Sequence, residues 1–347
     1  MTLAVRYISA RTLDTAPAEP SSPGPGEVEL APAFVGICGT DLHIFHGDMD
    51  ARVAAPAVLG HEMSGRVVRV GPGVEGWQPG DAVTVMPLRW DDTCPACRAG
   101  HQHICQHLDF IGIDSPGAMQ QRWTLPASTL IRLPGSLPLD RAALVEPTAV
   151  AVHDVGRAEV TEGEKVVVVG GGPVGVLIAL VARATGGDVR VVELSAHRRL
   201  LAEELGLTAW DPADDDVPAL VGEWTGQAGA DVAFEVSGAA GGVDTAVDVL
   251  GVRGRLCLVA IHPRPREINL HRFFWRELTL IGARLYERGD FEKAVTLVAD
   301  GTIAVGRLIS KVVPLTEAPA AFEALEGGGD VMKILVDCTD DTEGASA

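Results

Sequence analysis

The sequence predicts an α/β protein of two domains, on the basis of three observations. Short apolar runs separated by turns rich in glycine and proline fill the first 150 residues. From about residue 163 the pattern changes to alternating strands and helices. A last group of helices and strands follows residue 289, which suggests that the chain returns to its first domain. We therefore expect one domain over residues 1–150 and 289–347, and a second over 151–288.

The first domain is expected to be compact, mostly antiparallel β structure. Residues 27–30 and 66–70 alternate between polar and apolar side chains, as half-buried strands do, and turn signals follow at residues 71–73. Residues 80–81 form another turn signal before a short apolar strand that ends at residue 85. This rhythm of short strands and turns is typical of a small β domain.

The second domain is expected to begin at residues 165–169, where a run of valines is typical of a strand buried on both faces of a parallel sheet. A helix over 174–185, a strand over 189–193 and a helix over 197–205 follow. Further strands are expected over 231–236, 255–260 and 278–281, with a helix over 242–250. This alternation predicts a doubly wound sheet. Beyond residue 289, helices are expected over 291–300 and 318–326, and strands over 309–313 and 332–336.

Composition excludes several classes of function. The chain has 347 residues, of which 47% are hydrophobic, so each domain can bury a core. The net charge of −19 disfavours a nucleic-acid partner, because phosphate binding requires clustered Lys and Arg. The sequence has neither an apolar run of the ~18–20 residues that span a membrane nor a secretory signal pattern. These features predict a soluble cytoplasmic protein with a disordered acidic tail over 337–347.

A glycine-rich turn between the first strand and helix of the second domain predicts a dinucleotide site. Gly170 permits the tight turn, Gly172 lets the backbone approach a pyrophosphate, and Gly175 lets helix and strand pack closely. Glu193 ends the next strand, where a carboxylate would accept the ribose hydroxyls and repel a 2′-phosphate. The motif therefore predicts a Rossmann domain that prefers NAD to NADP, although the nearby Arg198 and Arg199 weaken the preference.

Two separated segments of the first domain carry the side chains that zinc prefers. Cys38 offers a thiolate and His61 an imidazole, and a catalytic zinc has three protein ligands and one open position. Because 23 positions separate the two residues, their spacing does not establish a site. A core thiol and a buried histidine are the alternative interpretation.

The remaining cysteines fall into two groups. Cys94, Cys97 and Cys105 lie close together, which in a cytosolic chain indicates a metal rather than disulfides. Cys257 lies within an apolar run and is expected to be a buried strand thiol. We assign no role to Cys338, which follows the last apolar stretch of the chain.

Several motifs in the same order resemble those of the zinc-containing alcohol dehydrogenases. The segment from Gly60 through His61 and Glu62 to Gly65, followed by Gly71 and Val74, resembles their signature. The segment over residues 38–43 resembles their first catalytic segment, and residues 76–81 fit their β domain. The chain thus resembles a medium-chain dehydrogenase/reductase from about residue 24 to 336. This resemblance implies a GroES-like catalytic domain joined to a Rossmann domain.

The resemblance implies a role for each residue of the two catalytic segments. Cys38 and His61 would be zinc ligands, and Glu62 would be either a ligand or a neighbouring carboxylate that exchanges with water. Asp41 would bond the far nitrogen of the histidine and fix its tautomer. Two further residues would remove the alcohol proton and pass it towards solvent: Thr40 and His43.

Glu146 stands where the sorbitol, butanediol and related polyol dehydrogenases carry a glutamate that binds zinc directly or through water. A solvated carboxylate at a domain boundary is the alternative. Residues that would line a substrate pocket, or else serve only in packing or at the surface, are Phe45, His46, Asp48 and Arg284.

The cysteine cluster resembles the structural zinc lobe of the same family, in which four cysteines bind the metal. Here Asp91 stands in the first position, before Cys94, Cys97 and Cys105. A carboxylate is a harder and weaker zinc ligand than a thiolate. The open alternatives are a metal-free lobe or a different fourth ligand, namely Asp92, His101 or His103.

Together these features predict reversible oxidation of a small polyol, diol or secondary alcohol to the ketone, with a catalytic zinc and NAD. The alternatives are oxidation of an amino alcohol, as in L-threonine 3-dehydrogenases, and an inactive relative that only binds NAD. The resemblance also implies a homodimer or homotetramer. Cofactor contacts are expected from Gly170, Gly172, Pro173, Val174, Gly175, Glu193, Arg198, Ser237 and Ile261.

Overall fold

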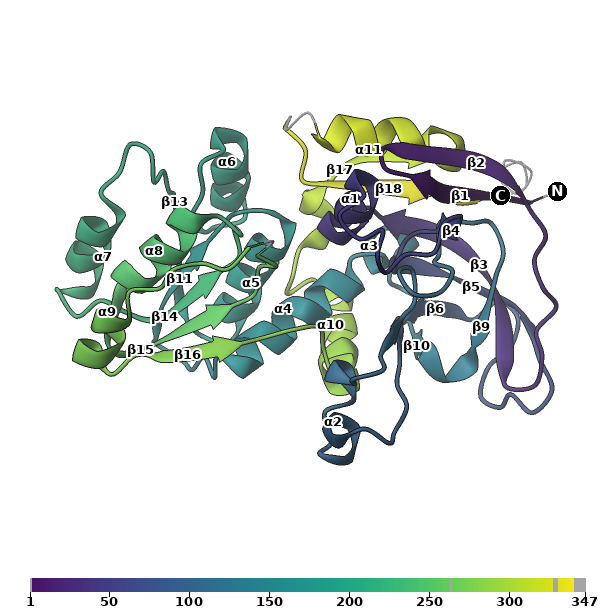
Figure 1. Ribbon diagram of the computed structural model, residues 1–347, viewed down its shortest axis with the longest axis horizontal. Helices are drawn as coiled ribbons and strands as arrows, with labels where there is room; N and C mark the ends of the chain where they lie inside the picture. The colour runs from purple at the N-terminus through teal and green to yellow at the C-terminus, as the bar shows by residue number, and fades with distance from the viewer. Residues whose placement is uncertain (1, 263, 327–329, 340–347) are drawn as a thin grey trace. The chain divides into compact units, whose positions relative to one another are not determined.

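The computed structural model describes residues 2–262, 264–326 and 330–339, which form two compact units (Figure 1). Unit 1 comprises residues 1–146, 287–301 and 308–347, and unit 2 comprises 147–286 and 302–307. The expected boundary at 150/151 falls inside helix α4 (Val145–Arg157), since the contacts divide near the beginning of that helix. Residues 302–307, which we had expected in the first domain, group with unit 2.

Unit 1 is built on a seven-stranded sheet in which only the last pair of strands is parallel. Its order is β10 (Leu130–Arg132), β6 (Ala82–Val85), β5 (Glu62–Val70), β3 (Glu27–Gly36), β18 (Lys333–Asp337) and β17 (Ile309–Pro314), with β9 (Trp123–Pro126) paired to β3. A three-stranded sheet holds β2 (Thr12–Ala18), β1 (Thr2–Ser9) and β4 (Ala57–Val58), and a two-stranded one holds β7 (Leu88–Arg89) and β8 (Asp109–Phe110). The mostly antiparallel β domain is confirmed.

Short helices complete unit 1. They are α1 (Gly39–His46), α2 (Pro95–Arg98), α3 (Leu139–Ala142), α10 (Arg288–Ala299) and α11 (Ala318–Glu326), with 3₁₀ turns over Gln102–Ile104, Ala127–Thr129 and Leu315–Glu317. A further 3₁₀ turn, Val305–Leu308, crosses from unit 2 into unit 1.

The central strand of unit 1, β3, positions the residues that carry chemistry. It pairs antiparallel with β5 in a register that sets Gly36 opposite Glu62. On its other side it pairs antiparallel with β18, with Leu335 opposite Gly36. Figure 1 shows this return of the C-terminal segment, in yellow beside purple, and the predicted return of the chain is confirmed. Three segments far apart in sequence thus meet at the end of β3.

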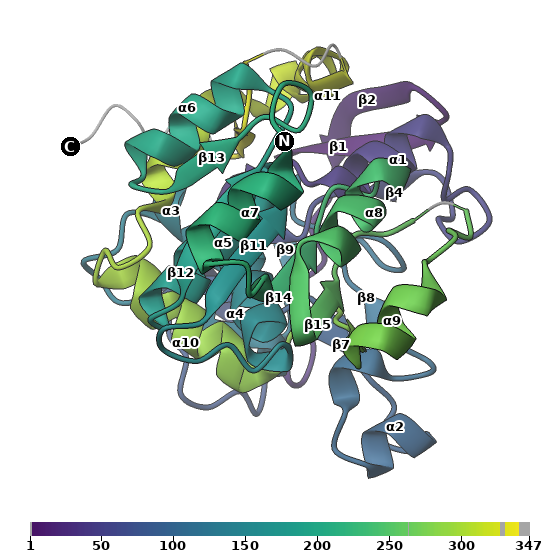
Figure 2. The ribbon, with the colours of Figure 1, turned by 90° about the vertical axis from the view of Figure 1, so that its left-hand side faces the viewer.

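Unit 2 is a six-stranded parallel sheet with helices on both faces (Figure 2). The strand order is β13 (Thr208–Trp210), β12 (Asp188–Val192), β11 (Lys165–Val169), β14 (Ala230–Glu235), β15 (Leu250–Leu258) and β16 (Thr279–Gly282). The helices are α4, α5 (Pro173–Ala184), α6 (Ala196–Glu204), α7 (Val217–Thr225), α8 (Ala240–Asp248) and α9 (Leu270–Arg276). The doubly wound sheet is confirmed, and its order reverses between β11 and β14, the position where such sheets bind ligands.

Alternate residues of the strands in unit 2 pack on opposite faces of the sheet. Val167 and Val169 of β11 pack in one buried cluster with Val217 and Val221 of α7. On the other face, the thiol of Cys257 in β15 lies against the backbone of α4, where it is fully buried as predicted. Because both faces are covered, the strands carry the continuous apolar runs seen in the sequence.

Several element boundaries differ from those expected. Strand β15 begins at residue 250 rather than 255, and α7 and α9 were not predicted. Asp337 ends strand β18 and Cys338 is buried, so the start of the expected disordered tail is wrong, whereas residues 340–347 lie outside the described part of the chain. Among the described residues, no helix has the length and hydropathy required to cross a membrane.

The neighbouring valines of β17 test the assignment of faces in unit 1. Val313 is 2% exposed and Val312 is 46% exposed, so replacing each by alanine makes the same chemical change on opposite faces. We expect Val313→Ala to lower the free energy of unfolding by about 2 kcal/mol and Val312→Ala by less than about 0.5 kcal/mol. Urea unfolding measures both values, and equal losses would contradict the register of this strand.

Candidate active site

The pairing of β3 with β5 brings the two predicted catalytic segments together. Cys38 follows the end of β3, and His61 precedes Glu62 at the start of β5. One ligand atom from each of these three residues lies within 4.8 Å of the others. Gly36 is required for this approach, because a Cβ there would lie 2.3 Å from a carboxylate oxygen of Glu62. The structure thus places a thiol, an imidazole and a carboxylate in one small volume.

Asp41 lies in the first turn of α1 and is fully buried. Its Oδ2 accepts a hydrogen bond from the backbone N–H of Cys38 at 2.9 Å. Its Oδ1 faces Nδ1 of His61 at 3.6 Å, which is longer than a hydrogen bond. The direct bond that we expected between Asp41 and His61 is therefore not formed here. The two facing atoms are buried without a hydrogen-bond partner.

His61 is buried and lies in a strongly negative environment. Burial by itself would lower its pKa, but the charges of Asp41 and Cys38 raise it well above the ordinary value for histidine. The pKa of Asp41 is itself raised by burial. The ring of Phe110 packs edge-on against the imidazole, with 5.1 Å between ring centroids. A cation bound by Cys38 and His61 would neutralise this excess of negative charge, so the donor set fits a zinc ion.

A buried lysine, Lys333, holds Glu62 in place. Its Nζ donates to Oε1 of Glu62 at 2.8 Å, to Oε2 at 2.7 Å and to the carbonyl oxygen of Ile37 at 3.1 Å. The lysine is 3% exposed and the glutamate 1%. Burial would lower the pKa of Lys333, but the adjacent Glu62 carboxylate raises it above the ordinary value. Both oxygens of Glu62 are therefore engaged by an ammonium group.

Sequence reasoning missed Lys333. The signal was present, since a single lysine stands at the head of the apolar run Ile334, Leu335 and Val336 in a predicted strand. Its partner lies 271 positions away, so no local pattern could identify it.

Glu146 is buried in the first turn of α4. Its charge contributes to the raised pKa values of both His61 and Lys333, which places it near the same cluster. It lies outside the group of mutually close ligand atoms formed by Cys38, His61 and Glu62.

The two residues of the expected proton path lie on α1. Thr40 is half-buried in its first turn. His43 is partly exposed, and its Nδ1 lies 3.1 Å from Oδ2 of Asp48. A path from Thr40 through His43 would therefore end at a solvent-accessible carboxylate.

Two of the residues considered for a substrate pocket have structural partners instead. Phe45 is buried and its ring packs against Phe322 at 5.6 Å between centroids. His46 forms an ion pair with Glu326. Arg284 is an exposed residue of unit 2.

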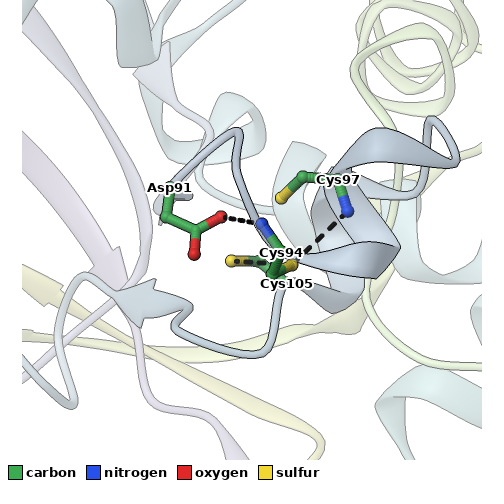
Figure 3. Close-up of side chains that lie close together, drawn as sticks. All are labelled: Asp91, Cys94, Cys97 and Cys105. Atoms are coloured by element: carbon green, nitrogen blue, oxygen red, sulfur yellow. Dashed lines mark hydrogen bonds between the residues drawn. The ribbon is translucent and has the colours of Figure 1, made fainter.

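The second cluster contains the three close cysteines and Asp91 (Figure 3). Ligand atoms of Asp91, Cys94, Cys97 and Cys105 all lie within 4.8 Å of one another. The sulfur atoms of Cys94 and Cys105 are 3.8 Å apart, the separation expected for two thiolates about 2.3 Å from one tetrahedral zinc. Backbone N–H groups of Cys97 and Gln106 donate to the sulfur of Cys94 and lower its pKa to about 7. This donor set fits a closed structural zinc site.

Asp91 has the contacts of an oriented ligand. Its Oδ1 accepts hydrogen bonds from the backbone N–H groups of Thr93 and Cys94, and its Oδ2 lies 2.5 Å from Nδ1 of His107. The adjacent His107 lowers the pKa of the Asp91 carboxyl well below its usual range. The alternative ligands Asp92, His101 and His103 lie outside the four-residue group. His107, which sequence reasoning missed, is marked only by its position two residues after Cys105.

The glycine-rich turn in unit 2 has the geometry of a phosphate cradle. Gly170 has a φ of +107°, and a Cβ there would lie 2.8 Å from the backbone nitrogen of Ser237. A Cβ on Gly175 would lie 1.8 Å from the carbonyl oxygen of Gly170, so helix α5 could not approach the strand. Gly172 caps α5, and the nearest atom to its Cβ position is a guanidinium nitrogen of Arg198 at 3.8 Å. This open space before the helix N-terminus fits a pyrophosphate.

Glu193 connects the second strand of unit 2 to the glycine turn. Its Oε2 accepts a hydrogen bond from the backbone N–H of Gly171, and its Oε1 from that of Ser195, both at 2.7 Å. The guanidinium of Arg198 lies 3.9 Å from Oε2. Pro173 and Val174 form the first turn of α5. Ser237 and Ile261 follow strands β14 and β15, and both are exposed.

Breaking the buried ion pair should destabilise unit 1. Lys333→Met would leave the Glu62 carboxylate buried without its cation, and we expect a loss of about 3–5 kcal/mol in the free energy of unfolding. Urea unfolding at a fixed zinc concentration measures this loss.

Two controls accompany this variant. Lys311→Met, on the exposed side of β17, should change stability by less than about 0.5 kcal/mol. The double variant Lys333→Met/Glu62→Gln should recover part of the loss, because it removes the unpaired charge. A Lys333→Met variant as stable as Lys311→Met would contradict the importance of the pair.

Comparison with known proteins identifies the family of this chain. Residues 24–135 match the family of the alcohol dehydrogenase GroES-like domain, and residues 173–300 match the zinc-binding dehydrogenase family. The chain is 48% identical to a 2-dehydro-3-deoxy-L-galactonate 5-dehydrogenase of Pseudoalteromonas atlantica over 335 residues, which covers 96% of this chain and 98% of that protein.

Two solved structures are also similar. The 2R,3R-butanediol dehydrogenase of Bacillus subtilis superposes with a TM-score of 0.90 at 31% identity, covering 97% of this chain and 99% of that one. A zinc-binding dehydrogenase of Sinorhizobium meliloti 1021, solved bound to NADP, superposes with a TM-score of 0.91 at 32% identity and the same coverage. The chain is therefore an oxidoreductase that belongs to the zinc-containing medium-chain dehydrogenase/reductase family.

Proposed function

We propose that this enzyme oxidises a secondary hydroxyl group of a sugar acid or polyol to the ketone, with zinc and NAD. The observation that carries the proposal is that ligand atoms of Cys38 and His61 lie within 4.8 Å of each other, beside the Glu62 carboxylate, in a chain that also contains the glycine turn of a dinucleotide site. The relative that is 48% identical acts on a 2-dehydro-3-deoxy sugar acid. Because that identity extends over nearly the whole chain, a sugar acid is the substrate class that we favour.

The residues around Cys38 would bind and orient the metal and move a proton. When bound, zinc supplies a Lewis acid that makes an alcohol hydroxyl acidic near neutral pH. Cys38 and His61 would hold it, with Glu146 as a third ligand directly or through water. Glu62, held by Lys333, would act as a neighbouring carboxylate. A further position would thus stay open for the substrate hydroxyl.

The proton released from the substrate would leave along α1. Thr40, in the first turn of that helix, would accept it, and His43 would carry it to solvent. Asp48 accepts from the imidazole of His43 when Nδ1 carries a proton, which leaves Nε2 free to receive another. This path ends at the molecular surface, where the exposed Asp48 can exchange protons with water.

Unit 2 would bind NAD through its glycine turn. NAD supplies the hydride acceptor. Gly170, Gly172 and Gly175 would admit the pyrophosphate at the start of α5, and Glu193 would accept the ribose hydroxyls. A carboxylate at this position disfavours a 2′-phosphate, which supports NAD. Two observations favour NADP instead. The guanidinium of Arg198 lies near Glu193, and the Sinorhizobium relative was solved with NADP bound.

We also propose that Asp91, Cys94, Cys97 and Cys105 hold a second, structural zinc. The matching sulfur separation and the burial of the cysteines support it. Asp91 would be the fourth ligand, with His107 fixing its orientation.

We also propose that the chain forms a homo-oligomer through unit 2. Strand β16 ends the order of the parallel sheet, and its Leu280 is 46% exposed. Large apolar side chains of the adjacent helix α9 are also exposed, namely Leu270, Phe274 and Trp275. Pairing of two such edges would cover this apolar surface. Light scattering on the purified protein checks the oligomeric state, and a monomer at micromolar concentration would contradict this part.

A substrate panel tests the proposed activity. Reduction of NAD and of NADP is followed with 2-dehydro-3-deoxy-L-galactonate, 2R,3R-butanediol, sorbitol and L-threonine. We expect the highest kcat/KM for the sugar acid with NAD, at least about tenfold above the others, because each additional polar contact in the transition state is worth about that factor. Preference for threonine would favour the amino-alcohol alternative. Lack of turnover on every alcohol would favour the inactive relative.

A variant of the metal site tests the zinc assignment, and a second cysteine variant serves as its control. Cys38→Ala should abolish turnover and reduce bound zinc by one ion per chain while leaving NADH binding intact. Cys338→Ala removes a buried thiol distant in sequence and should leave both quantities unchanged. Full activity of Cys38→Ala would refute the assignment of the catalytic metal.

A further inference from the structure

One buried carboxylate organises the loops at the point where the strand order of unit 2 reverses. Glu235 is the last residue of β14 and is fully buried. Its Oε1 accepts hydrogen bonds from the backbone N–H and hydroxyl of Ser237, at 3.0 and 2.5 Å, and from the backbone N–H of Gly238 at 3.0 Å. The side chain of Glu235 therefore folds the loop after β14 back onto the end of its own strand.

The second oxygen of Glu235 binds a histidine from the next strand segment. His262, just after β15, lies with its Nε2 2.9 Å from Oε2 of Glu235. Nε of Arg266 donates to the other ring nitrogen, Nδ1, at 3.3 Å. A guanidinium cannot accept a hydrogen bond, so Nδ1 is the acceptor and Nε2 carries the proton that is donated to Glu235. The imidazole is thus oriented at both nitrogens.

We propose that His262 is a positioning residue for the dinucleotide, because it ties the loop after β15 to the loop after β14 through Glu235. This inference rests on the proposed NAD site of unit 2. The two loops carry Ile261 and Ser237, which are expected to contact the cofactor. The contact of Ser237 with Gly170, whose Cβ position lies 2.8 Å from the serine nitrogen, links the same network to the glycine turn.

The surrounding packing shows why the histidine acts on the loop rather than on the core. Backbone N–H groups of Val259 and Ala260 both donate to the carbonyl oxygen of Glu235, so the end of β15 is held without the histidine. Beyond that point Ile261 is 72% exposed, whereas the side chain of His262 is only 15% exposed. Loss of His262 would therefore release an exposed loop, which the cofactor would have to order when it binds.

Helix α8 packs closely against the side chains of Glu235 and Ser237. A Cβ on Gly242 would lie 2.1 Å from the hydroxyl oxygen of Ser237 and 2.9 Å from Oε1 of Glu235. Glycine at this position lets the helix pack directly on the carboxylate network. The network thus joins β14, β15 and the start of α8 at the edge where the glycine turn lies.

Titration of the full-length, zinc-loaded protein with NADH, followed by fluorescence, tests the inference. We expect His262→Leu to raise the Kd for NADH about tenfold, because the cofactor would then have to order the loop after β15 when it binds. His262→Gln, whose amide nitrogen can reach Glu235, should stay within about threefold of the wild type. His271→Leu removes an exposed histidine of α9 in the same unit and should leave the Kd unchanged.

Steady-state kinetics separates positioning from a general loss of structure. The KM for NAD should rise in His262→Leu, while kcat at saturating NAD and zinc content stay close to those of the wild type. Unaltered NADH binding by His262→Leu, or equal weakening by the Leu and Gln variants, would overturn the inference. Should His262→Leu fail to fold, His262→Asn replaces it, since its amide is too short to reach Glu235, and it must bind NADH more weakly than His262→Gln. A wild-type protein that does not bind NADH would instead refute the proposed cofactor site itself.

Discussion

The register between β3 and β5 is the constraint on which the candidate active site depends. It sets Gly36 opposite Glu62, so that the residues just beyond the two strand ends, Cys38 and His61, meet. A slip of one residue would turn each side chain of β5 to the other face of the sheet and separate the two ligands. Strand β18 adds Lys333 from the far end of the chain, and its ammonium group compensates one carboxylate of a cluster rich in buried acids.

Buried or half-buried carboxylates perform the same structural task in both units. Asp41 caps α1 and faces His61, Glu193 binds the glycine turn, and Glu235 holds two loops of the parallel sheet. In each case oxygen atoms accept backbone N–H groups that the end of a strand or the start of a helix leaves unpaired. In Glu235 the remaining oxygen lies against a histidine, His262. Loops with functional residues are thus fixed by polar contacts, while the sheets are stabilised by apolar burial.

Much of the fold could be predicted because local patterns carry it. The valine run at β11 gave the strand bounds without error, and the glycine spacing at Gly170 predicted the turn, since both depend on neighbours in sequence. The start of β15 was missed because Gly251 and Gly254 interrupt its apolar pattern. Contacts between distant residues could not be predicted: Lys333 lies 271 positions from Glu62, and His262 lies 27 from Glu235. Nor could the sequence reveal that Asp41 caps α1 through Oδ2 and that its Oδ1 lies 3.6 Å from Nδ1 of His61.

The central claim is that two sets of side chains in unit 1 each bind a zinc ion. Anomalous diffraction from zinc-loaded crystals, recorded on both sides of the zinc absorption edge, tests it most directly. The account predicts two peaks per chain, one bounded by Cys38 and His61 and one by Asp91, Cys94, Cys97 and Cys105. Absence of a peak between Cys38 and His61, in crystals where the cysteines are reduced and zinc is in excess, would contradict it.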